Sequence, residues 1–188
     1  MDRVLFDVPL YSQSWDLDNW KKLGFKSRDE AEYWEKSCCG ILCINEIASF
    51  LNKTSYSTVK LIEQGQKLGG YSDKHGWSHD GLVKLATELG LKADRKSQTL
   101  NDLKIALDDG RLPIISIKWA FKPTKSVKEK LFFWKKYGGH LAVVVGYNDK
   151  GFYVNHTSKI AEQNWKARLI PYDRFEAGYT GRAILVWK

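Results

Sequence analysis

The chain has 188 residues, of which 43% are hydrophobic and 13% aromatic, and its 30 basic and 22 acidic side chains give a formal net charge of +8. These values exclude a disordered or fibrous chain and indicate a single domain over residues 1–188 with a core of its own. No apolar run could span a membrane and the first ten residues lack the apolar region of a signal peptide, so we expect a cytoplasmic protein, with secretion by another route as the alternative.

The first half of the chain is predicted to be mainly helical. Residues 4–11 have the composition of a short strand, whereas residues 16–36 are charged and aromatic without a clean period and indicate a surface segment. Apolar residues spaced by three and four, N-cap residues and terminal glycines predict helices that begin near positions 39, 57, 78 and 99. Residues 71–79 are predicted to form a loop, and Thr99 with Asp102 resembles a capping box.

The second half is predicted to form an antiparallel sheet. Strand-type apolar runs and turn residues predict strands over residues 112–119, 141–147, 152–155, 166–170 and 181–187, with a short helix near 172–177. Helices followed by strands indicate the α+β class, in which an N-terminal helical half packs on a C-terminal antiparallel sheet.

Residues 118–136 combine seven lysines and a single acid, Glu129, with five aromatic side chains. Such a mixture can bind nucleic acid, but the segment contains neither arginine nor a glycine-rich repeat. We therefore expect a solvated amphipathic insertion, with a helix over residues 127–136, and no nucleic-acid binding. Its positive charge favours an acidic partner or substrate, with a merely solvated surface as the alternative.

The three cysteines of the chain, Cys38, Cys39 and Cys43, lie within six positions. They cannot form a disulfide framework, and no histidine stands at a zinc-ligand spacing from them, so we expect no metal and no cofactor. Cys39 and Gly40 stand where a helix begins, and the free backbone N–H groups there favour a thiolate. Cys39 is therefore the candidate nucleophile, and a buried helix with three apolar cysteines is the alternative.

A cysteine nucleophile needs a base and a group that orients the base. His140 precedes one predicted strand, and Asn155 lies on the returning strand of the same hairpin, although a bulge could shift their register. A glutamine amide upstream of the nucleophile, Gln13, together with the backbone N–H of Cys39, could stabilise an oxyanion. Taken singly, these residues are typical of a core histidine, a turn former and a surface residue.

The sequence resembles the papain-like cysteine peptidases of the bacteriocin-processing (double-glycine leader peptidase) family in a stand-alone form. The resemblance rests on short motifs in the family's order: VPLYSQ (8–13), CG (39–40), GW (76–77), LPII (112–115) and GHLAVVVGY (139–147). It implies a papain-like fold with Cys39 as nucleophile, His140 as base, Asn155 as orienting residue and Gln13 in the oxyanion hole.

Three features depart from that family. Asn155-His156 stands where the family has Asp followed by Pro, charged residues separate Gln13 from Cys39, and no transporter segment follows, so we do not carry over the leader-peptide substrate. The sequence predicts a thiol hydrolase of peptide or amide bonds in a peptide or protein substrate. Another acyl transfer, such as transpeptidation or deamidation, and an inactive peptide-binding domain are the alternatives.

We further expect substrate to be bound beside the nucleophile by Trp77, in the 71–79 loop, and by Gly139, next to His140. A core position is the alternative for Trp77.

Overall fold

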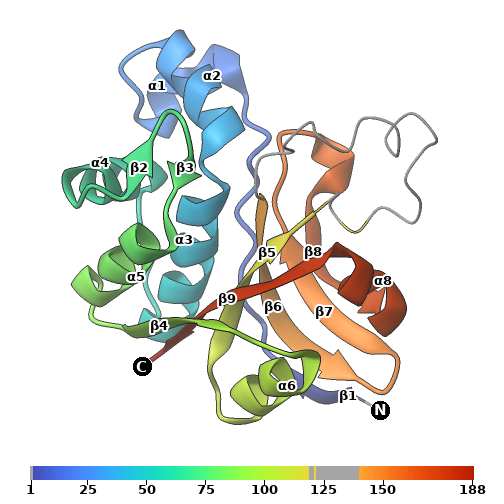
Figure 1. Cartoon of the computed structure of the whole chain (residues 1–188). Coiled ribbons are helices and arrows are strands. Elements are labelled where there is room, and N and C mark those ends of the chain that lie inside the picture. Colours follow the sequence, from blue (N-terminus) through green and yellow to red (C-terminus); the bar gives the residue numbers. More distant parts are fainter. Residues whose placement is uncertain (1, 119–120, 122–139) are drawn as a thin grey trace.

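The computed structural model describes residues 2–118, 121 and 140–188 (Figure 1). The predicted helix over residues 127–136, the lysines of that segment after Lys118, and Gly139 lie outside the described residues. Within the described ranges, no helix is both long enough and apolar enough to cross a membrane.

The second half of the chain forms most of a seven-stranded sheet. Its strands follow the order β4-β9-β5-β6-β7-β8, β1 pairs with β6, and each pairing is antiparallel. The strands are β1 (Asp2–Leu5), β4 (Lys92–Ser97), β5 (Leu112–Ile117), β6 (His140–Asn148), β7 (Gly151–His156), β8 (Trp165–Pro171) and β9 (Tyr179–Trp187). A separate two-stranded ribbon pairs β2 (Tyr71–Ser72) with β3 (Gly76–Trp77).

Most helices come from the first half and lie beside the sheet, as Figure 1 shows. They are α1 (Trp20–Leu23), α2 (Arg28–Ser37), α3 (Cys39–Asn52), α4 (Thr58–Lys67), α5 (His79–Glu88), α6 (Leu100–Asp108) and α8 (Tyr172–Gly178), with short 3-10 turns at η1 (Leu17–Asn19) and η3 (Ala161–Gln163). The arrangement confirms the predicted α+β class, with a helical N-terminal half against a C-terminal antiparallel sheet.

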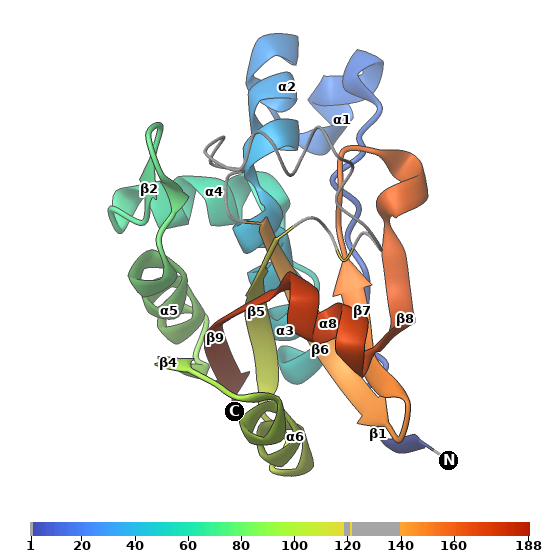
Figure 2. The same ribbon diagram turned by 45° about the vertical axis from the view of Figure 1, so that its right-hand side comes forward.

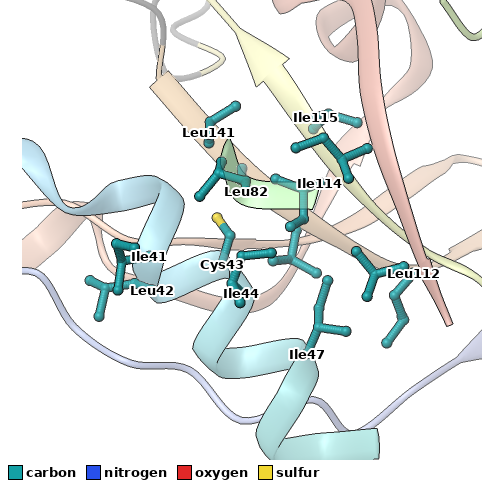
Figure 3. Close-up of a cluster of buried hydrophobic side chains, with 14 of the residues drawn as sticks. Ile41, Leu42, Cys43, Ile44, Ile47, Leu82, Leu112, Ile114, Ile115 and Leu141 are labelled. Atoms are coloured by element: carbon teal, nitrogen blue, oxygen red, sulfur yellow. The ribbon is translucent and has the colours of Figure 1, made fainter. Parts of the chain in front are cut away.

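Helix α3 lies at the centre of the molecule, between β6 and the helices α4 and α5. Every residue from Gly40 to Ser49 is buried, as expected for a helix that is covered on all sides. Figure 3 shows the sulfur of Cys43 in α3 pointing toward Leu82 of α5, with Leu141 of β6 beyond it. Strand β5 is buried throughout, and Figure 2 shows α8 in front of the sheet and α3 behind it. Coverage of both faces explains the continuous apolar runs of the central strands.

The structure corrects several predicted elements. The first strand ends at Leu5 rather than at residue 11, and the expected surface segment contains α1 and α2. Ser27 caps α2 by accepting a hydrogen bond from the backbone N–H of Glu30 at 3.1 Å, and Ala31 and Trp34 are its buried positions. The 71–79 loop contains the β2–β3 ribbon. The predicted capping box of Thr99 and Asp102 is present at the start of α6.

Candidate active site

Cys39 is the first residue of α3, and a single residue, Cys38, separates this helix from α2. Cys38 and Cys43 are buried, whereas Cys39 is partly exposed. A Cβ atom on Gly40 would come within 2.9 Å of Leu82 Cδ1 and 3.2 Å of Leu141 Cδ1. The glycine therefore lets the start of α3 approach both α5 and β6.

The ionisation of Cys39 differs from the sequence prediction. Burial raises the pKa of its thiol above the ordinary value, although backbone N–H groups, first that of Leu141 and then those of Gly40 and Cys39, act in the opposite direction. The expected acidification at the helix start is present but smaller than the desolvation effect. A base must therefore remove the proton when the sulfur reacts.

His140 begins β6, and its neighbour Leu141 lies beside the start of α3 and lines one cavity together with Cys39. His140 Nε2 lies 2.8 Å from the backbone oxygen of Thr157. A carbonyl oxygen only accepts hydrogen bonds, so Nε2 carries the proton and Nδ1 is left able to accept one. Burial lowers the pKa of His140, against a smaller raising effect of the Thr157 carbonyl, and favours the neutral ring.

The structure does not place Asn155 in contact with His140. Asn155 lies opposite Val143 in the β6–β7 register. Its Nδ2 donates to the backbone oxygens of Val8 and Pro9, both at 3.2 Å, and its Oδ1 accepts from the N–H of Ala167 at 2.8 Å. Among the described residues, the group that contacts His140 Nε2 is the Thr157 carbonyl. Sequence reasoning missed this group because a backbone oxygen leaves no signal in residue identity.

A buried carboxyl, Glu46 of α3, completes the contacts around Asn155. Glu46 Oε1 accepts from the backbone N–H of Tyr11 at 3.1 Å, and Oε2 accepts from Asn155 Nδ2 at 3.4 Å. Burial raises the pKa of Glu46 to about 8, more than these two hydrogen bonds lower it. We call Glu46 and Asn155 the polar clasp, because they fasten residues 8–11 to α3 and β7.

Gln13 is held between two anchored neighbours. Tyr11 is bound to Glu46 of α3, and the N–H of Trp15 donates to Glu35 Oε1 of α2 at 3.1 Å. Gln13 therefore lies in a segment that is bound to both α2 and α3, the two helices joined at Cys38. Its side chain is only 4% exposed, and its Oε1 has no hydrogen-bond partner among the described residues.

His156 packs against the predicted base, with ring centroids 4.7 Å apart. Its Nδ1 lies 2.6 Å from the backbone oxygen of Gln163. Burial, followed by the nearby His140, lowers the pKa of His156 to about 4, so this ring is neutral near pH 7. It therefore carries no charge beside His140, and it stands at the position where the resembling family has Pro.

A cavity of about 520 Å³ opens beside Cys39. Leu141, Ser116 and His79 line it on the side of the sheet and α5, and the β2–β3 ribbon lines it with Gly76 and Trp77. Trp77 is 9% exposed and packs against Trp34 and Tyr71, so it both belongs to the core and borders the cavity. In the described ranges, no group of three or more His, Cys, Asp and Glu side chains is placed to hold a metal ion.

Solved structures share this fold at low sequence identity. A putative C39-like peptidase from Bacillus anthracis is 15% identical, with 98% of this chain and 97% of that chain covered and a TM-score of 0.65. A double-glycine-motif protease from an AMS/PCAT transporter, solved with its leader peptide, is 16% identical, with 99% and 96% covered and a TM-score of 0.58. The peptidase domain of Streptococcus ComA, a bifunctional ABC transporter involved in quorum sensing, is 19% identical, with 79% and 90% covered and a TM-score of 0.56.

Comparison with curated proteins gave no match. The likeness to solved structures establishes the papain-like fold that the sequence motifs implied. At the level of sequence, the Peptidase C39 family matches residues 33–188, which include Cys39, His140 and both sides of the cavity. The chain therefore belongs to the Peptidase C39 family of cysteine peptidases.

Proposed function

We propose that this protein hydrolyses peptide bonds through a thioester on Cys39, with His140 as the general base. The observation that carries the proposal is that the partly exposed Cys39 lines a cavity with Leu141, the residue that follows a histidine whose Nε2 lies 2.8 Å from the Thr157 carbonyl. A nucleophile, a base and a group that orients the base are the parts that this chemistry requires.

The reaction begins when His140 Nδ1 takes the thiol proton and the sulfur bonds to the substrate carbonyl carbon. Negative charge collects on the carbonyl oxygen, and the backbone N–H of Cys39 and the amide of Gln13 are the donors we assign to it. The imidazolium then gives its proton to the leaving amine as the C–N bond breaks. Water, deprotonated by His140, attacks the thioester, and the free thiol and a carboxylate product are released.

The structure leads us to assign the orienting role to the Thr157 carbonyl instead of Asn155. The carbonyl fixes the same tautomer of His140 that an orienting side chain would fix. It carries a dipole and no full charge, so it stabilises an imidazolium less than a carboxylate would. This agrees with the raised pKa of Cys39, because the neutral thiol–imidazole pair is then the resting form.

The proposed substrate is a peptide that lies along the cavity beside Cys39. One solved relative was crystallised with a leader peptide, which supports a peptide ligand for this fold. We assign Trp77 to the wall of the binding site because its ring borders the cavity while the core holds it in place.

The test combines active-site alkylation with peptide cleavage. Iodoacetamide should modify Cys39 in the folded protein, and a peptide library should show Cys39-dependent cleavage. Cys39→Ala should abolish both, whereas Cys43→Ala, which removes a buried thiol of the same helix, should retain both. Labelling of Cys39 without cleavage of any peptide would favour the inactive binding domain and contradict the proposal.

A further inference from the structure

The cavity beside Cys39 is bordered by more cations than acids. Four basic side chains, Lys36, Lys74, Arg95 and Arg182, line it together with one acid, Asp73. Lys36 pairs with Glu32 at 2.7 Å and Arg95 with Asp80 at 2.8 Å, and neither acid lines the cavity.

Arg95 and Arg182 form the wall of the cavity at the β4 edge of the sheet. They lie on the paired strands β4 and β9, where Ser97 is opposite Arg182. The two arginines also line a second cavity of about 170 Å³, so they stand between two openings. Arg182 is exposed and has no ion pair with any other described residue.

A chain of contacts connects this wall to the nucleophile. His79 also lines both cavities, and its Nε2 lies 2.9 Å from Ser116 Oγ. Ser116 is opposite Leu141 in the β5–β6 register, and both line the cavity together with Cys39. The arginine wall is therefore one side of the cavity that Cys39 also lines.

The positive field of the wall reaches into this space. Burial lowers the pKa of His79, and the charges of Arg182 and then Arg95 lower it further, against a smaller opposing effect of Asp80. His79 is therefore neutral near pH 7, and the fixed positive charge of the wall comes from the two arginines.

We propose that Arg182, assisted by Arg95, binds a carboxylate of the peptide substrate close to the scissile bond. The proposal rests on the proposed peptidase function and names its substrate class. A guanidinium presents its donors in a planar fork that matches a carboxylate, and Arg182 has no described acid competing for it. The carboxylate can come from an Asp or Glu side chain or from the end of the substrate chain.

The first experiment measures the wall without any peptide. Iodoacetate carries a carboxylate and iodoacetamide is its neutral counterpart. The ratio of the iodoacetate rate to the iodoacetamide rate at Cys39 therefore reports the local electrostatic field. Arg182→Gln should lower this ratio by about two- to five-fold, the range of an exposed ion pair. Arg111→Gln, which removes the same charge from an arginine that lines neither cavity, should leave the ratio unchanged. Equal ratios in all three proteins would overturn the proposal.

The second experiment uses peptides that differ only by Glu or Gln at one position, with the C-terminus either free or amidated. Wild type should cleave the Glu or free-acid form with the higher kcat/KM, and the position identifies the source of the carboxylate. Arg182→Gln should remove this preference, and Arg182→Glu should reverse it so that the Gln form is cleaved with the higher kcat/KM. Cleavage without any acidic preference would overturn this proposal and leave the peptidase intact. If no peptide is cleaved, the peptidase proposal fails and the alkylation ratio alone decides whether the wall binds a carboxylate.

Discussion

At the scale of single residues, a substitution at Asn155 distinguishes a structural role of this side chain from a role in orienting His140. Asn155→Ala leaves the N–H of Ala167 and two carbonyls of residues 8–9 without their buried partner. We expect a loss of about 1–3 kcal/mol in the free energy of unfolding, measured by denaturant titration. The pH midpoint of Cys39 alkylation should stay unchanged. A shifted midpoint at unchanged stability would instead show that Asn155 orients His140.

The pH dependence of Cys39 alkylation follows from the burial of its thiol. The pKa of its thiol is raised, so the reactive thiolate accumulates only as the pH rises beyond the range of an ordinary cysteine, about 8.5. The rate of iodoacetamide modification should therefore still be rising at that pH. A plateau near neutral pH would show that a thiolate–imidazolium pair forms in the resting protein.

His156 should make the fold sensitive to acid. Its pKa falls from 6.5 to about 4 on folding, so the unfolded chain binds the proton more readily. The free energy of unfolding therefore falls by up to about 3 kcal/mol as the pH drops from about 6.5 to about 4. In denaturant titrations at different pH values, His156→Gln should flatten this part of the stability profile. His140→Ala should leave most of the acid sensitivity, although it should abolish turnover. Equal acid sensitivity in wild type and His156→Gln would rule out this origin.

At the scale of elements, the start of α3 depends on the absence of a side chain at Gly40. In Gly40→Ala, the new methyl group meets Leu82 and Leu141, and a shift of Leu141 changes the wall of the cavity beside Cys39. We expect Cys39 alkylation and turnover to fall about ten-fold or more, with at most about 1–3 kcal/mol lost in stability. Adding Leu82→Ala should restore part of the alkylation rate by making room. No change in rate would show that Leu141 does not position the sulfur.

The elements that sequence reasoning missed share a physical cause. In α2, only Ala31 and Trp34 are buried, so charged neighbours hide the helical period. Strand β4 contains no buried residue, and as an edge strand it needs no apolar alternation. The central strands were predictable because both faces of the sheet are covered, which requires continuous apolar runs.

At the scale of the whole molecule, contacts between distant segments decided what the sequence could reveal. The start of α3 at Cys39 could be predicted because a helix start is a local feature, and the start of β6 at His140 because an apolar run follows it. The contacts of Asn155 could not be predicted, because the polar clasp joins residues 8–11, α3, β7 and β8. The arginine wall likewise exists only through the pairing of β4 with β9.

The arrangement of the two halves also sets the order in which the protein becomes reactive during synthesis. Cys39 leaves the ribosome with the helical half, whereas its partner on β6 and the carbonyl of Thr157 emerge much later. Strand β6 is held between β5 and β7, so the histidine is fixed only when that hairpin has closed. Under the proposed mechanism, a nascent chain therefore carries its thiol without a positioned base, and we expect no peptide cleavage before the β6–β7 hairpin has closed.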